Sequence, residues 1–206
     1  MQYQHLYKIF KKSKLIHVKK GQFIPSTSIY SIKNGFVLLT AKNKAEKVYL
    51  ILKKGELFPV VQLFNNVSDK LNFKAHTDCQ LLSISKTGFL KEVGKNPKVA
   101  MDFIYYLVNY LNMYIDRVTN LEIDGARKKI AYRLSFFQDR FGEKTAKGIL
   151  IDIPLTHKLI ARSLNLSRET VSREFSKLAK ANIIQISSKR MIIKNSKALT
   201  KLASYN

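Results

Sequence analysis

Residues 155–184 read LTHKLIARSLNLSRETVSREFSKLAKANII, and this stretch decides the fold of the C-terminal part. Thr156 is placed to cap a first short helix, and Ser167 is placed to cap a second helix over residues 168–178. Between the two helices, Asn165 tolerates the left-handed backbone conformation that a tight three-residue turn requires. Two amphipathic helices joined by so short a turn predict a helix-turn-helix.

The second helix carries polar side chains on its outward side. Arginine can fork onto the two acceptors of guanine, glutamate can accept from the amino group of cytosine, and serine can approach several bases. Glu169 and Arg173, four residues apart, are also expected to brace one another. The outward residues are Arg168, Glu169, Ser172, Arg173 and Ser176, and the apolar residues expected in the core are Ile160, Leu164, Leu166, Val171, Phe175 and Leu178.

Taken alone, such a polar face is also typical of a solvated helix surface with one salt bridge. The elements around it favour DNA reading, because a strand at 148–154 precedes the two helices and a hairpin at 183–194 follows them. In this position the hairpin is a wing, and a last short helix at 197–203 closes the domain. Phosphate contacts are assigned to Lys189 and Arg190 at the wing tip and to Thr156, Ser167, Thr170 and Ser176.

The charge of the chain points to the same region. The 206 residues hold 37 Lys plus Arg against 14 Asp plus Glu, a net charge of +23. After residue 124 there are 18 basic and 5 acidic residues, compared with 19 and 9 before it. A lysine-rich chain can also arise from an AT-rich genome, but a cationic excess concentrated in one part favours a polyanionic partner, with nucleic acid first.

The N-terminal part shows a different pattern. From residue 15 to residue 84, short β-branched or aromatic runs alternate with turn signals at intervals of about ten residues, which predicts an antiparallel barrel or sandwich. Asn34-Gly35, between Ile32 and Phe36, predicts a two-residue hairpin, because both turn positions tolerate positive φ. This part is therefore expected to be all β.

From residue 96 to about residue 120 the apolar period becomes helical. Four further residues, Tyr105, Tyr106, Leu111 and Ile115, widen the main stripe, so the helix has apolar surface for more than one neighbour. A second copy of the helix in a homodimer is the expected neighbour, and burial by its own domain alone is the alternative. The tyrosines are interpreted as core residues, with a ligand pocket as the alternative. The stripe assigned to the dimer contact is Phe103, Leu107, Tyr110, Tyr114, Val118 and Leu121.

Asp124-Gly125 interrupts the helical pattern and is interpreted as a hinge. Asp124 is expected to cap a helix that begins at Ala126, and Gly142 is expected to end that helix. The predicted organisation is a β-rich domain at 1–95, a long helix at 96–123 and a helix-turn-helix domain at 124–206.

Several classes of protein are disfavoured. No apolar run approaches the ~20 residues that span a bilayer, and the first residues do not resemble a signal peptide. Cys79 is the single cysteine and cannot form a disulfide or hold a metal cluster alone, so a reduced, cytoplasmic protein without a membrane segment is expected. An RNA-binding protein would need RNA-binding motifs, and none is present. Four histidines without ligand spacing argue against an enzyme: His5, His17, His76 and His157.

Residues 153–203, with the stretch quoted above and then KRMIIKNSKALTKLA, closely resemble the winged helix-turn-helix of the Crp/Fnr superfamily. The β-rich start, with Gly21, Gly35 and Gly55-Glu56, resembles the effector-binding β-roll of that family, and the long helix resembles its dimerisation helix. The resemblance implies an α+β fold: a cyclic-nucleotide-binding-like β-roll, a dimerisation helix and a winged helix-turn-helix. It also implies a homodimeric transcription regulator whose partners are double-stranded DNA and RNA polymerase.

The resemblance assigns base reading to particular residues. In the fumarate-nitrate branch the reader positions are occupied here by Glu169, Ser172 and Arg173. In the cyclic-AMP branch they are occupied by Arg168, Glu169 and Arg173, so the sequence satisfies both sets. A palindromic site with a TGA core in each half is therefore expected, with TGTGA and TTGAT as the leading half-sites.

The family's usual effectors fit less well. In the cyclic-AMP branch an Arg-Ser pair holds the cyclic phosphate, but residues 69–72 here read DKLN, and Lys70 or Lys74 lacks the planar fork of arginine. The iron–sulfur mode needs several cysteines. Haem could be bound by His17 or His76, but a lone histidine among strands is more often a structural or surface residue. No cofactor is identified, and the two open alternatives are an unidentified small ligand or none.

Overall fold

The computed structural model of the chain describes residues 3–42, 47–63, 70–187 and 190–204. Its contacts divide it into two compact units, residues 1–115 and 116–206, and the boundary falls inside one long helix. The predicted boundaries lay at the two ends of that helix, at residues 95/96 and 123/124. Two hydrogen bonds, from Tyr132 to Asp116 and from Asn120 to Lys129, join the last turns of the helix to the rest of the second unit.

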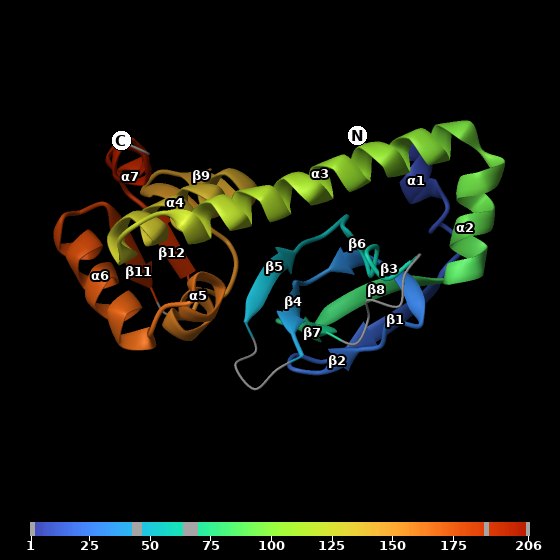
Figure 1. Cartoon of the computed structure of the whole chain (residues 1–206), viewed down its shortest axis with the longest axis horizontal. Helices are drawn as coiled ribbons and strands as arrows, with labels where there is room; N and C mark the ends of the chain where they lie inside the picture. Colours follow the sequence, from blue (N-terminus) through green and yellow to red (C-terminus); the bar gives the residue numbers. More distant parts are fainter. Residues whose placement is uncertain (1–2, 43–46, 64–69, 188–189, 205–206) are drawn as a thin grey trace. The chain divides into compact units, whose positions relative to one another are not determined.

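The first unit is built on two four-stranded antiparallel sheets, with strand orders β1-β8-β3-β6 and β2-β7-β4-β5 (Figure 1). It is the β-roll that the resemblance implied, and the antiparallel prediction is confirmed. A short helix, α1 (Gln4–Lys8), precedes the strands. The strands are β1 (Lys14–Val18), β2 (Phe23–Ile24), β3 (Ser28–Asn34), β4 (Val37–Ala41), β5 (Val48–Leu52), β6 (Leu57–Phe58), β7 (Leu71–Ala75) and β8 (Cys79–Ser85).

The hairpin predicted at Asn34-Gly35 is wrong. The strand before this turn, β3, pairs with β8 and β6, whereas the strand after it, β4, pairs with β5 and β7. The turn therefore carries the chain from one sheet to the other. Gly35 does have a positive φ, of 90°, and a Cβ there would lie 2.4 Å from the carbonyl oxygen of Asp78. Both the backbone conformation and the close approach require glycine.

Two helices follow β8, namely α2 (Lys86–Lys95) and α3 (Pro97–Glu122), and α3 confirms the predicted long helix. Pro97 takes its first helical position, where the missing N–H has no intrahelical partner to lose. One side of α3 packs on the roll. Phe103, Tyr106 and Tyr110 are each 4% exposed, and Leu107 and Tyr114 pack partly buried against the same core.

The structure corrects the dimer stripe assigned to α3. Phe103 and Tyr110 fill the core of their own unit, so they are not available to a second copy. Leu107 and Tyr114 are partly buried against the same core. Leu121 is half-buried, and Val118 is exposed. The other side of the helix carries a different apolar row that is 47–57% exposed: Met101, Ile104, Val108, Leu111, Ile115 and Val118.

An aromatic stack lies in the hydrophobic core of the first unit. The ring of Phe58 stacks on Tyr30 at 5.2 Å and on Phe73 at 4.9 Å between centroids, and all three residues are buried. Next to them, the Tyr106 hydroxyl donates to the carbonyl of Leu57 and accepts from its N–H. Of the tyrosines whose role was left open, Tyr106 and Tyr110 are core residues, whereas Tyr105 is exposed.

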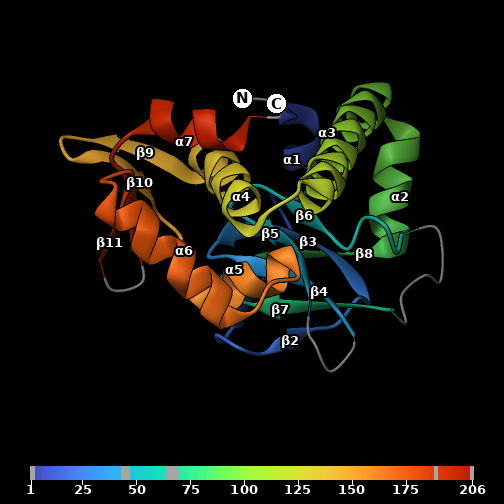
Figure 2. The ribbon, with the colours of Figure 1, turned by 60° about the vertical axis from the view of Figure 1, so that its left-hand side comes forward.

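The second unit contains a four-stranded antiparallel sheet of order β11-β12-β10-β9. Figure 2 shows the helices of this unit beside its strands β9, β10 and β11. Helix α4 (Ala126–Phe141) buries the apolar residues expected of it: Ile130, Leu134, Phe137 and Phe141. The remaining elements are β9 (Gly142–Thr145), β10 (Gly148–Ile151), α5 (His157–Leu164), α6 (Arg168–Lys180), β11 (Ile184–Ser187), β12 (Arg190–Ile193) and α7 (Ser196–Ala203).

The N-terminal end of α4 differs from the prediction, whereas the C-terminal end confirms it, because Gly142 is the C-cap and its N–H donates to the carbonyl of Gln138. The N-cap is Gly125, with a φ of 81° and no side-chain capping bond, so the cap predicted at Asp124 is wrong. Gly142 has an extended conformation and also begins β9, a strand that was not predicted. A Cβ on Gly142 would lie 2.2 Å from the carbonyl oxygen of Gln138, so close approach is the reason for glycine there.

Candidate nucleic-acid interface

Three local signals build the helix-turn-helix, and all three act as predicted. The Thr156 hydroxyl accepts from the Leu159 N–H at 3.1 Å and caps α5. Asn165 ends α5 in the left-handed conformation, with φ 55° and ψ 38°. The Ser167 hydroxyl then accepts from the Thr170 N–H at 3.0 Å and caps α6. Each helix of the pair therefore starts with a capping hydroxyl that satisfies one of its terminal N–H groups.

The apolar sides of α5 and α6 form the expected core. Ile160, Leu164, Val171, Phe175 and Leu178 are at most 2% exposed, and Leu166 is half-buried. The His157 ring also packs edge-on against Phe175, with 5.0 Å between centroids. Burial lowers the pKa of His157, and the nearby positive charge of Arg168 adds to this effect. Because one side of α6 is buried in this core, the residues on its opposite side face outward in a fixed orientation.

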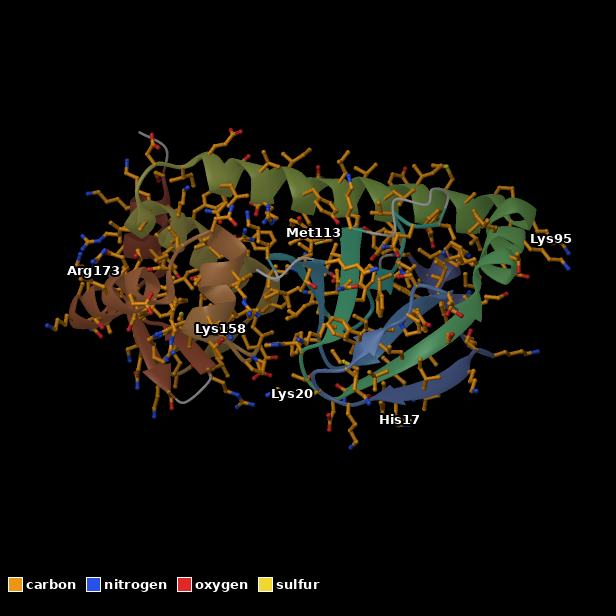
Figure 3. The ribbon with its side chains drawn as sticks, turned by 60° about the horizontal axis from the view of Figure 1, so that its bottom comes forward. His17, Lys20, Lys95, Met113, Lys158 and Arg173 are labelled. Atoms are coloured by element: carbon orange, nitrogen blue, oxygen red, sulfur yellow. The ribbon has the colours of Figure 1, made fainter. Side chains whose placement is uncertain are left out.

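The outward side of α6 presents the four predicted base readers. Arg168, Glu169 and Arg173 are exposed and Ser172 is half-buried. The side chain of Arg173 is 67% exposed and lies at the surface of the second unit (Figure 3). The brace predicted between Glu169 and Arg173 is wrong, since in the described part of the chain the ion pair of Arg173 is with its neighbour Glu174, at 3.8 Å.

Glu174 was not among the predicted site residues, but it lies beside Arg173 and makes two hydrogen bonds. Its side chain is 7% exposed, and it lies on the inner side of α6. One carboxylate oxygen accepts from the Lys177 ammonium at 2.7 Å, and the other accepts from Nε of Arg127 at 3.0 Å. These hydrogen bonds, the one from Lys177 first, lower the pKa of Glu174. A glutamate at an inward helix position, flanked by cations, is the sequence signal that indicates such a pair.

The residues assigned to DNA phosphate contacts have different surroundings. The hydroxyls of Thr156 and Ser167 serve as helix caps, and the Ser167 hydroxyl also donates to that of Thr170. Ser176 donates to the carbonyl of Ser172 on its own helix. On β12, Arg190 pairs with Asp152 at 3.1 Å and is still 65% exposed. The other wing-tip residue, Lys189, lies outside the described residues.

The cysteine of the roll is not poised for redox chemistry. The Cys79 sulfur lies 3.3 Å from the carbonyl oxygens of Phe36 and Thr77, and burial raises its pKa, so the thiol stays protonated at neutral pH. Among the described residues no three His, Cys, Asp or Glu side chains are grouped to hold a metal ion. Within the same ranges no helix is long and apolar enough to cross a membrane.

Comparison with known proteins agrees with this architecture. Residues 13–96 match the cyclic nucleotide-binding domain family, and residues 128–202 match the Crp-like helix-turn-helix domain family. The anaerobic regulatory protein of Bacillus subtilis is 25% identical over 169 residues, which are 80% of this chain and 71% of that protein. The cAMP-activated global transcriptional regulator CRP of Salmonella typhimurium is 25% identical over 192 residues, 92% of this chain and 89% of that one.

A solved structure shows the same fold over nearly the whole chain. FixK2 from Bradyrhizobium japonicum superimposes with a TM-score of 0.81 at 19% identity, covering 94% of this chain and 98% of that chain. A β-roll, a long helix and a winged helix-turn-helix together define a transcription regulator with a helix-turn-helix DNA-binding domain. The chain belongs to the Crp/Fnr family.

Proposed function

We propose that the chain acts as a homodimer that binds a palindromic DNA site with TGA in each half and regulates transcription from it. The observation that carries the proposal is the outer side of α6, where the four candidate base readers share one side of a helix whose opposite side is fixed in a core. A recognition helix held in this way fits the major groove, and two copies related by two-fold symmetry fit a palindrome.

Each reader has a chemical role in this proposal. The guanidinium of Arg173 donates to O6 and N7 of the guanine in TGA, and Glu169 accepts from a cytosine amino group on the opposite strand. Arg168 and Ser172 contact the flanking bases, so TGTGA and TTGAT both remain leading half-sites. Phosphate contacts come from the ends of α5 and α6 and from the wing: Thr156, Ser167, Thr170, Ser176, Lys189 and Arg190.

The exposed row on α3 supports the homodimer. Its members alternate at intervals of three and four residues from Met101 to Val118, which is a seven-residue repeat. Such a repeat is typical of two helices in a left-handed coiled coil, and Val108, Leu111 and Ile115 are the kinds of side chain found in its seam. A second copy of α3 covers this row most simply, because the same row on the partner is self-complementary.

The proposed regulator uses neither cyclic AMP in the family's usual mode nor an iron–sulfur cluster. Gly55-Glu56 is not followed by an arginine at residues 69–72, and the thiol of Cys79 is the only one in the chain. Its DNA binding is controlled by an unidentified small ligand or needs no ligand, and the binding experiment with ligand-free protein separates these two alternatives. Its place of action is the cytoplasm, its further partner is RNA polymerase, and its role involves no catalysis.

Fluorescence anisotropy with defined duplexes tests the proposal. The purified protein, without added ligand, is titrated at about 150 mM salt with palindromes of TGTGA or TTGAT, with duplexes in which one half-site is scrambled, and with a fully scrambled duplex. One palindrome is expected to bind about a thousandfold or more tightly than the scrambled duplex, with the half-site duplex in between. Equal affinity for all of them would contradict specific binding.

A further inference from the structure

The carboxylate of Glu174 joins two helices of the second unit. It accepts from Nε of Arg127 at 3.0 Å, and Arg127 is the second residue of α4, only two residues after Gly125. It also accepts from Lys177 at 2.7 Å, but Lys177 lies on α6 itself, one turn along the helix. Of these two hydrogen bonds, only the one from Arg127 connects the recognition helix to another element.

Glu174 is also the immediate neighbour of the proposed guanine reader. Nε of Arg173 lies 3.8 Å from the same oxygen that accepts from Lys177. Adjacent residues of a helix point about 100° apart, so the inward direction of Glu174 fixes the outward direction of Arg173. A small rotation of α6 about its axis would move both side chains together.

We propose that Glu174 is a positioning residue for DNA reading: its bond to Arg127 holds α6 at the rotation at which Arg173 faces the base edges. The inference rests on the proposed function and adds to it the residue that orients the side chain of Arg173. A nearly buried carboxylate is costly to leave unpaired, so the pair with Arg127 restricts the rotations available to α6. Apolar packing at Val171, Phe175 and Leu178 holds the helix in place but is non-directional, whereas a hydrogen-bonded pair fixes an angle.

A role in stability alone would predict something different. If Glu174 merely stabilised the second unit, its replacement would lower the melting temperature and the fraction of active protein, but active molecules would still distinguish the guanine as well as before. If Glu174 orients Arg173, a fully folded Glu174 variant should distinguish the guanine from other bases less well than the wild type does. The ratio of two affinities separates these cases, because the active fraction cancels from it.

The test compares Glu174→Gln and Arg127→Met with Lys177→Met as the matched control. Each variant is titrated with the preferred duplex and with the same duplex in which the guanine of each TGA is replaced, and each is also melted to confirm folding. We expect the ratio of the two affinities to fall about tenfold in the first two variants and to stay unchanged in Lys177→Met. The double variant of Arg127 and Glu174 should lose no more than either single variant, because both remove one interaction.

Binding to scrambled DNA supplies the second readout. Glu174→Gln removes a negative charge, so its affinity for scrambled DNA should be equal to or higher than that of the wild type. Folded Glu174→Gln or Arg127→Met protein with wild-type discrimination would overturn the inference, and so would an equal loss in Lys177→Met. If the wild type itself shows no discrimination, the proposed function fails, and the inference that rests on it fails with it.

Discussion

The Tyr106 hydroxyl on α3 makes two hydrogen bonds with one residue of the roll. It donates to the carbonyl of Leu57 at 3.0 Å and accepts from the Leu57 N–H at 2.8 Å. Both groups are buried, and Leu57 belongs to β6, the edge strand of the sheet β1-β8-β3-β6. One phenol thus satisfies backbone groups of an edge strand and attaches that strand to the long helix.

Tyr106→Phe should lower the stability of the first unit. The substitution keeps the ring, so the packing is preserved, but it leaves the N–H and carbonyl of Leu57 without this partner in a buried position. The expected cost is about 1–3 kcal/mol in the free energy of unfolding, measured by chemical denaturation. Tyr105→Phe, at an exposed position of the same helix, is the control and should change little. An unchanged free energy for Tyr106→Phe would show that these two bonds contribute nothing net.

Arg173→Ala should relax specificity at one base pair. Because Arg173 is exposed on the outer side of α6, its removal leaves the core of the helix-turn-helix intact. Specific binding should weaken by about 1–3 kcal/mol, and the preference for guanine at that position should disappear, as measured by anisotropy with all four bases tested. Equal losses on the specific and the scrambled duplex would identify Arg173 as a phosphate contact instead.

Leu111→Glu should separate the proposed dimer. Leu111 lies in the middle of the exposed row on α3, so the variant would place a carboxylate in an apolar seam, twice per dimer. The loss of two buried leucine side chains costs about 3 kcal/mol or more, and sedimentation equilibrium should show a shift towards monomer. Lys98→Glu, on the same helix but outside the row, is the charge control. A dimer that persists in Leu111→Glu would place the interface on another surface.

Glu174 should make the second unit sensitive to acid. Its pKa in the folded state lies below the ordinary value of 4.5, chiefly because Lys177 donates to it and then because Arg127 does. A lowered pKa contributes stability that is present above pH 4.5 and is lost as the pH falls below it. The difference in unfolding free energy between the wild type and Glu174→Gln should therefore shrink towards pH 3. A constant difference across this range would mean that the carboxylate charge is not what stabilises the fold.

The helix-turn-helix was predictable because its signals are local. Thr156, Asn165 and Ser167 each act on backbone groups within three or four residues, so neighbouring sequence is sufficient to assign them. The hairpin predicted at Asn34-Gly35 shows the limit of such signals. The positive φ of Gly35 was correctly expected, but which strands pair afterwards depends on residues distant in the chain, such as Lys74 and Ala75 on β7.

The face of α3 that meets its own domain could not be predicted from periodicity. The helix is apolar on two sides, and the large aromatic residues around Phe103 and Tyr110 gave the stronger stripe. These bulky rings fill the space beside the roll, and the smaller aliphatic row around Val108 and Leu111 is left exposed. Glu174 was missed for a related reason, because its partner Arg127 is 47 residues away in the chain.

Selection of random duplex DNA by the purified, ligand-free protein at about 150 mM salt tests the central claim most directly. The bound fraction is sequenced without any assumed site. We expect a two-fold symmetric sequence with TGA-containing half-sites about one helical turn apart. Recovery of AT-rich sequence without symmetry or a TGA core would contradict it, and would indicate that the cationic second unit binds DNA through its charge alone.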